Sequence, residues 1–298
     1  MQRIDINSIS DFRIGSVQDE TARTGVTVII AENGARGGVD ISGGGPATRE
    51  TPLLQPLTAD NPLNAVVLSG GSAFGLAASD GVMHYLESRG IGYETGFAKV
   101  PLVTQACIYD LGVGSSSVRP DAAMGYDACV ASEKRAQISG HIGAGCGATV
   151  GKLHGPAMAS RSGLGVYAAK LGELEMGAVV SVNSLGDVYD FETGAKICGM
   201  KDGRCDEALY ERYASTDLYT GNTTIACIIT NGAFFKAEMS KIASMARAAF
   251  ARCISPIGTM ADGDTIFALG SGKVDADVNV AGTLAADVLA RAIREAVK

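Results

Sequence analysis

The sequence predicts an α/β protein whose β-sheets are buried under helices. Short, almost wholly apolar runs typical of buried strands lie at residues 26–30, 65–68, 178–182, 225–230 and 266–269. Glycine-rich turns and stretches with helical spacing of apolar residues separate these runs. No period of about 20 to 50 residues repeats, and no linker rich in Pro, Ser and Gly divides the 298 residues. We therefore expect one α/β domain over residues 1–298.

Each element has its own signal along the chain. The run at 26–30 consists of Val, Ile and Thr, whose branched side chains favour strands. The run at 65–68 leads into a glycine-rich turn, and a helical pattern follows Gly75. The runs at 178–182, 225–230 and 266–269 are too short for helices and are expected to be interior strands. Helical spacing is clearest at 236–253 and 281–297, where apolar residues share one face.

Composition excludes several classes of partner. The formal net charge is −7 and no block of five like charges occurs, so we expect no nucleic-acid partner. The amino-terminal segment lacks the apolar core of a signal peptide, and no apolar stretch approaches the ~20 residues of a membrane span. Seven cysteines without a CxxC pair suit a reducing, cytoplasmic setting, and the three histidines show no metal-ligand spacing. We expect no membrane partner, no metal and no organic cofactor.

Two glycine-rich stretches resemble known loops without matching them. Residues 65–86 have the strand, turn and helix layout of nucleotide loops and nucleophile elbows, but the glycines around Ser72 fit neither spacing. The alternative is a tight turn that brings backbone N–H groups near a ligand or another strand. Residues 140–153 end in Gly151-Lys152, as a phosphate loop would, but Cys146 and Leu153 replace the glycine and the Ser or Thr it requires. The alternative is a loop packed near the active centre or at a subunit contact.

The stretch "NTTIACIITN", which begins at Asn222, allows three interpretations. Thr223 and Thr224 suit the start of a buried strand, and the three residues also match the N-x-[ST] glycosylation sequon. In the third interpretation Thr223 attacks the preceding carbonyl, and hydrolysis of the ester frees it as a new amino terminus. Its α-amino group would then serve as a base for its own hydroxyl, because the pKa of such a group is ordinarily ~7.7–8.0. The residue types alone leave these interpretations open.

Longer segments resemble one peptidase family. They include "GGGPATRET", "NAVVLSGGSAFGLAASDGVMHYLESRGIGYE", "GAGCGATVGKL", "NTTIACIITN" and "ADGDTIFALGSG". Together they are similar to peptidase family S58, the family of the L-aminopeptidase/D-esterase DmpA and the β-peptidyl aminopeptidases. The resemblance implies a four-layer αββα sandwich of DmpA type, like the Ntn hydrolases with different connectivity. It also implies self-cleavage into residues 1–222 and 223–298, and homo-oligomers that are tetramers or larger.

The resemblance also implies roles for individual residues. Cleavage falls between Asn222 and Thr223, which makes Thr223 the nucleophile, with Thr224 as the alternative. The acidic loop that orients the nucleophile matches Asp262 and Asp264, of which Asp264 is expected to hold the α-amino group.

Three further positions carry over from the family. Asn183 matches the asparagine that donates to the oxyanion, and Tyr109 matches the active-site tyrosine. Cys107 stands where aminopeptidases of the family have a glutamate for the substrate's amino group. A neutral thiol cannot pair with an ammonium group, so we do not expect strict selection of a free amine.

We therefore predict a self-processing, aminopeptidase-like hydrolase with an amino-terminal threonine. Its expected substrates are small peptides or amino-acid amides and esters. Two alternatives remain: an autoprocessing acyltransferase similar to the ornithine acetyltransferases, and a member of the fold that binds ligands without turning them over.

Overall fold

The computed structural model describes residues 1–134, 136, 139–214 and 221–298. Its main strands form one hydrogen-bonded path in the order β1, β11, β12, β15, β17, β3, β5, β8 and β4, with β2 paired to β3. The bounds are β1 (Gln2–Ile4), β2 (Arg13–Asp19), β3 (Thr24–Ile41), β4 (Thr48–Arg49), β5 (Leu63–Ser69), β8 (Val103–Cys107), β11 (Leu164–Leu171), β12 (Leu174–Asn183), β15 (Thr223–Ala233) and β17 (Thr265–Asp275).

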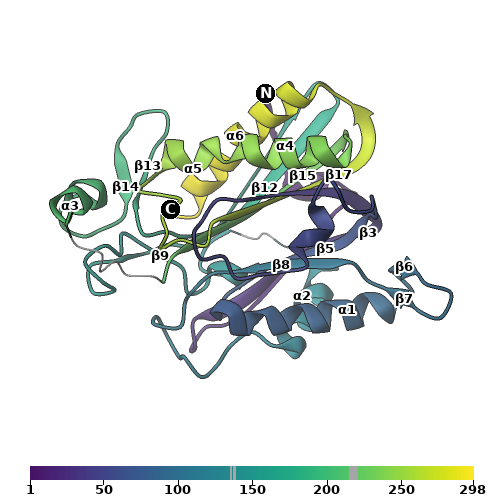
Figure 1. Cartoon of the computed structure of the whole chain (residues 1–298), viewed down its shortest axis with the longest axis horizontal. Helices are drawn as coiled ribbons and strands as arrows, with labels where there is room; N and C mark the ends of the chain where they lie inside the picture. The colour runs from purple at the N-terminus through teal and green to yellow at the C-terminus, as the bar shows by residue number, and fades with distance from the viewer. Residues whose placement is uncertain (135, 137–138, 215–220) are drawn as a thin grey trace.

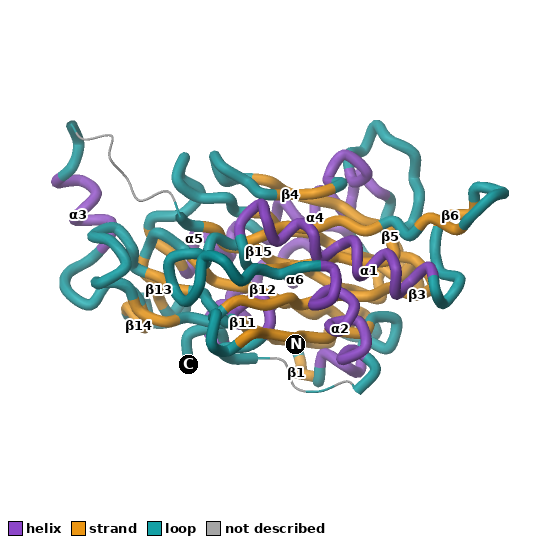
Figure 2. The backbone as a smooth tube through the Cα atoms, turned by 90° about the horizontal axis from the view of Figure 1, so that it is seen from below, coloured by secondary structure: helices purple, strands orange, loops and turns teal. Residues whose placement is uncertain are grey.

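Helices and short strands complete the chain. The helices are α1 (Ala78–Glu87), α2 (Ala122–Ser132), α3 (Cys205–Glu211), α4 (Lys236–Ala246), α5 (Ala248–Cys253) and α6 (Val278–Glu295), with 3-10 turns at Ile6–Ser8, Thr51–Leu54, Ser72–Ala77 and Gly143–Gly145. The short strands are β6 (Tyr93–Glu94), β7 (Lys99–Val100), β9 (Thr149–Val150), β10 (Ser160–Arg161), β13 (Asp187–Tyr189), β14 (Lys196–Cys198) and β16 (Ile254–Ser255). Figure 2 shows α3 at one end of the molecule and the β6–β7 hairpin at the other. None of the helices in the described part of the chain is long and apolar enough to cross a bilayer.

The 18-residue strand β3 belongs to two sheets that lie face to face. Its first part, residues 24–30, pairs with β2 and β5, and its last part, residues 36–41, pairs with β17. Helices α4, α5 and α6 cover the outer face of one sheet, and α1 and α2 cover the outer face of the other (Figure 1). The architecture is therefore a four-layer αββα sandwich.

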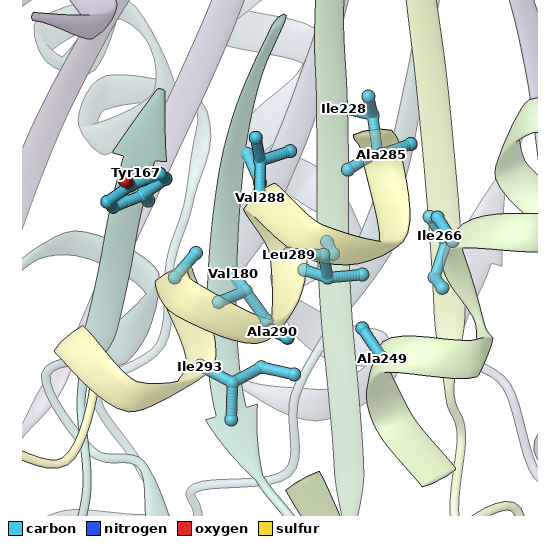
Figure 3. Packing of buried hydrophobic residues seen from close by; sticks show 14 of the residues in the cluster. Tyr167, Val180, Ile228, Ala249, Ile266, Ala285, Val288, Leu289, Ala290 and Ile293 are labelled. Atoms are coloured by element: carbon cyan, nitrogen blue, oxygen red, sulfur yellow. The ribbon is translucent and has the colours of Figure 1, made fainter. Parts of the chain in front are cut away.

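Successive side chains of β15 point to two opposite faces, and both faces are buried, which explains its unbroken apolar run. Ile225, Cys227 and Ile229 face the core between the two sheets, whereas Ala226 and Ile228 face the core under α6. Figure 3 shows this second core, in which side chains of α6 lie over β12, β15 and β17. Because both faces of the strand are buried, only its two ends can present side chains to a substrate.

All five predicted strands are confirmed, since they lie within β3, β5, β12, β15 and β17. The helix expected at 236–253 is divided at Arg247 into α4 and α5, because the Phe250 N–H donates to the carbonyl of Arg247, three residues back, rather than four. The helix expected after Gly75 is α1, preceded by a 3-10 turn. Helix α2 and strand β11 were not predicted, because their many small residues leave no clear spacing of large apolar side chains. All seven cysteines are free thiols, and six of them are buried.

Candidate active site

Three predicted residues meet where strands begin and end. Asn183 is the last residue of β12 and Thr223 the first of β15, and the antiparallel register pairs them directly. Strands β15 and β17 run parallel, so both begin at this same edge. Asp264 immediately precedes β17. Strand pairing therefore brings together residues that are up to 81 positions apart, from 183 to 264.

The Thr223 hydroxyl lies against the carbonyl group that it would attack. Thr223 is 5% exposed, and its Oγ1 donates to the carbonyl oxygen of Asn222. The backbone N–H of Gly263 donates to the same oxygen over 3.0 Å. A Cβ added at Gly263 would lie 2.7 Å from Thr223 Oγ1, so the chain approaches the hydroxyl as closely as a glycine allows.

Two buried carboxyl groups lie near the Asn222–Thr223 bond, on the side of β17. Asp264 accepts hydrogen bonds from the N–H of Thr224 over 2.7 Å and the N–H of Gly258 over 3.0 Å. Asp262 accepts from both the N–H and the hydroxyl of Thr259, over 2.9 and 2.6 Å. Burial raises the pKa of both carboxyl groups, and the negative charge of Asp262 raises that of Asp264 further. The pair therefore resists full ionisation near neutral pH.

The side chain of Asn183 is held in one orientation. Its Oδ1 accepts from Lys152 Nζ over 2.8 Å and from the N–H of Thr149 over 3.0 Å. Its Nδ2 donates to the carbonyl oxygen of Tyr109 over 2.9 Å. An amide nitrogen carries two hydrogens, so one remains to stabilise an oxyanion.

Lys152 belongs to the site although its role was not predicted. Its side chain is buried, and Nζ lies 2.8 Å from both Asn183 oxygens and 3.0 Å from the carbonyl oxygen of Gly221. Burial lowers the pKa of Lys152 to about 7, while Asp262, Asp110 and Asp264 oppose that shift. Lys152 is the only charged residue in the apolar, glycine-rich stretch 142–153. This contrast with its neighbours is the sequence signal from which a role for Lys152 could have been predicted. This stretch packs beside the site, which was one of its two expected alternatives.

The glycine-rich turn after β5 positions Tyr109 through the next residue, Asp110. The buried Asp110 carboxylate accepts from the N–H of Gly71 and the hydroxyl of Thr24, each over 2.7 Å. A Cβ at Gly70 would lie 1.9 Å from that carboxylate, so only glycine fits there. The turn therefore brings a backbone N–H to another strand end, and no contact of Ser72 with Thr223 is present among the described residues.

Cys107 lies away from these groups. It is 1% exposed, and its Sγ contacts Ser69 Oγ at 3.1 Å and Gln105 Nε2 at 3.6 Å. Burial raises the pKa of the thiol to about 12, so it is a neutral group packed between strands. This geometry does not place Cys107 in contact with a substrate.

A small pocket of about 220 Å³ opens beside the site. Tyr109, which is 37% exposed, forms part of its wall. A larger pocket of about 810 Å³ between α4 and α6 contains none of the predicted site residues, so the smaller one is the candidate for substrate. The described residues that line the smaller pocket include Arg23, Tyr109, Thr149, Lys152, Arg161 and Gly221.

Comparisons with known proteins agree with the resemblance. The profile of peptidase family S58 matches residues 5–298. An uncharacterized aminopeptidase of Mycobacterium leprae is 39% identical over 92% of this chain and 82% of that protein. A 6-aminohexanoate-oligomer endohydrolase of Kocuria sp. is 32% identical over 99% and 86%. The solved L-aminopeptidase D-Ala-esterase/amidase of Ochrobactrum anthropi, described as a new variant among the Ntn hydrolase fold, superposes with a TM-score of 0.69 at 15% identity, over 96% of this chain and 82% of that one. The predicted fold class is confirmed.

Proposed function

We propose that this chain, which belongs to peptidase family S58 and is an aminopeptidase-like amide hydrolase, cuts its own Asn222–Thr223 bond and then uses Thr223 as an amino-terminal nucleophile. The observation that carries the proposal is the arrangement at this bond. The hydroxyl of Thr223 and the N–H of Gly263 both contact the carbonyl group of Asn222. One supplies the attacking oxygen and the other stabilises the negative charge that develops on the carbonyl oxygen.

Self-cleavage follows from these contacts in two steps. Thr223 Oγ1 adds to the carbonyl carbon of Asn222 and loses its proton, and the Thr223 nitrogen leaves with a proton, which produces an ester. Water then hydrolyses the ester, which releases the Asn222 carboxylate and the α-amino group of Thr223. Lys152 holds the carbonyl of Gly221, the residue before Asn222, so this segment stays in place during both steps.

Turnover would use the new amino terminus as the base. The α-amino group takes the Thr223 hydroxyl proton as Oγ1 attacks the substrate carbonyl, and later returns a proton to the leaving amine. The remaining N–H of Asn183 donates to the oxyanion. We expect Asp264 to hold the α-amino group of Thr223, and its bond to the N–H of the next residue, Thr224, supports this role. Water then releases the acyl group from Thr223.

The proposal extends to substrate size, assembly and location. A pocket of about 220 Å³ suits a small group, so we expect small peptides and amino-acid amides or esters as substrates. We also propose one domain over residues 1–298 that matures into two chains, a homo-oligomer that is a tetramer or larger, and a cytoplasmic location. Light scattering after size exclusion measures the assembly of the matured protein.

Denaturing mass spectrometry with a matched pair of variants tests the proposal. The purified protein should yield pieces of residues 1–222 and 223–298. Thr223→Val keeps the branched shape and removes the hydroxyl, so this chain should stay intact. Thr224→Val makes the same change at the adjacent residue, whose buried hydroxyl has no hydrogen-bond partner among the described residues. This variant chain should still cleave itself. An intact wild-type chain after long incubation at neutral pH, or a new amino terminus at Thr224, would contradict the proposal.

A further inference from the structure

Two arginines line the pocket beside the proposed nucleophile. Arg23 lies in the turn between β2 and β3, and Arg161 ends β10. Lys152 also lines this wall, but its amino group is already bonded to Asn183 and Gly221, so the two guanidinium groups supply the positive charge that faces the pocket. Among the described residues, no Asp or Glu lines this pocket. The pocket is therefore electrostatically positive, and an anionic group is the natural occupant.

The arginine donors are available to a ligand. In the described part of the chain neither Arg23 nor Arg161 forms an ion pair, whereas most other arginines do. One N–H of Arg161 donates to the carbonyl oxygen of Cys146 over 3.2 Å. A guanidinium carries five N–H donors in a fork that matches a carboxylate, so several remain.

The backbone at Arg23 is held in an unfavourable conformation. Its φ is 53°, in the left-handed region that non-glycine residues rarely adopt. Two glycines approach it closely: a Cβ at Gly147 would lie 2.1 Å from the carbonyl oxygen of Arg23, and one at Gly114 would lie 3.1 Å from its Cβ. Strain of this kind persists where surrounding contacts impose it, and it concentrates at functional sites.

Arg161 is tied to the oxyanion donor through the strand next to it. In the β9–β10 pair, Arg161 is opposite Thr149. The N–H of Thr149 holds Asn183 Oδ1 over 3.0 Å. A group bound by Arg161 therefore lies next to the element that orients Asn183, close to the scissile carbonyl of a bound substrate.

We propose that this pocket binds a carboxylate of the substrate, so that the enzyme acts on amides that carry a free carboxylate near the scissile bond. The inference rests on the proposed function and adds the substrate class. A carboxylate would accept paired hydrogen bonds from Arg23 and Arg161, while an ammonium group there would face like charges. The neutral, buried Cys107 offers no charge that would reverse this selection.

Matched substrates test which side of the amide carries the carboxylate. Ala-Gly and its carboxamide Ala-Gly-NH2 differ on the leaving-group side, and the p-nitroanilides of Asp and Asn differ on the acyl side. In at least one pair kcat/KM should favour the acid by roughly ten- to a hundredfold, the range of a charge-assisted hydrogen bond. No preference for the acid in either pair would overturn the inference.

Variants connect the preference to the pocket. Arg23→Gln and Arg161→Gln should each lower the acid-to-amide ratio of kcat/KM at least tenfold while turnover of the neutral substrate persists. Arg36→Gln makes the same change far along β3, at an exposed residue paired with Asp60, and should leave the ratio unchanged. An unchanged ratio in both pocket variants overturns the inference. If a glutamine variant fails to fold, its lysine counterpart should keep the charge and part of the preference.

The outcomes separate this inference from the function it rests on. A matured protein that hydrolyses neutral substrates without preferring acids leaves the hydrolase intact and removes the carboxylate site. If the matured protein hydrolyses nothing, the proposed function fails, and calorimetry on the intact Thr223→Val chain still tests the pocket. N-acetylglycine should then bind at least tenfold more tightly than its carboxamide, and equal binding overturns the inference.

Discussion

Gly263→Ala tests whether the position of the Thr223 hydroxyl controls self-cleavage. The new Cβ would lie 2.7 Å from Thr223 Oγ1 and 2.8 Å from the carbonyl oxygen of Gly45. The variant keeps the backbone N–H that binds the Asn222 carbonyl, so the polarising contact is preserved. Gly263 is not among the glycines with positive φ, so alanine can adopt its backbone conformation. The substitution therefore displaces the Thr223 hydroxyl and also presses on the loop that carries Gly45.

The size of the effect follows from the overlap. Ordinary contact of a Cβ begins at 3.4 Å, so Oγ1 or its surroundings must move by 3.4 − 2.7 = 0.7 Å. A misplacement of about 1 Å at a reacting group can cost roughly 10²-fold in rate. We expect self-cleavage of Gly263→Ala to be about ten- to a hundredfold slower than that of the wild type.

Gly45→Ala is the matched control for this change. Gly45 lies in the facing loop, and a Cβ there would meet only the carbonyl oxygen of Asp262, at 3.9 Å. Its N–H, which donates to that same oxygen over 2.8 Å, is kept. The appearance of the piece 223–298 is followed by denaturing mass spectrometry on freshly made precursor, and thermal unfolding reports whether each variant is folded. A folded Gly263→Ala precursor that cleaves as fast as Gly45→Ala would refute the reasoning.

Three further predictions concern the groups around Thr223. Asn183→Ala should lower kcat of the matured enzyme roughly 10²–10³-fold, as removal of one oxyanion donor does; a near-normal rate in a processed variant would remove Asn183 from the mechanism. Lys152→Met removes a buried donor that serves both oxygens of Asn183 and the carbonyl oxygen of Gly221, so chemical denaturation should show that the free energy of unfolding falls by about 1–3 kcal/mol; unchanged stability would show that other donors replace it. Asp262→Asn removes a negative charge that raises the pKa of Asp264, so that pKa should fall. On the acid side of the pH profile, kcat/KM falls as Asp264 gains a proton, so this limb should move to lower pH. An acid limb that stays at the same pH, or moves to higher pH, would show that a group other than Asp264 controls it.

Strand ends explain why part of the site was visible in the sequence. Asn183, Thr223 and Asp264 each lie at the boundary of an apolar run, where a polar residue stands out against its neighbours. Both faces of β15 are buried, so the run after Thr223 is unbroken and its polar start is easy to recognise. The resemblance to the family then gave each of these residues an expected role.

Groups that act through distant partners were not visible in the same way. Lys152 bonds to Gly221, 69 residues later, and Asp110 bonds to Thr24, 86 residues earlier. No local spacing encodes such pairs. Cys107 shows the opposite case, because matching it to a family position suggested a substrate contact, whereas the fold buries its thiol between strands.

The sequence by itself determined the interior strands, the helical faces and the residues at the strand ends, because burial leaves a period of about 2 or about 3.6 in the order of residues. Only the tertiary structure decided which of those ends meet, because pairing of β12, β15 and β17 depends on contacts between segments that are far apart in the chain. It also decided the charge of the pocket. Arg23 and Arg161 are 138 residues apart, and they line one wall only because β10 and the β2–β3 turn fold against the same site.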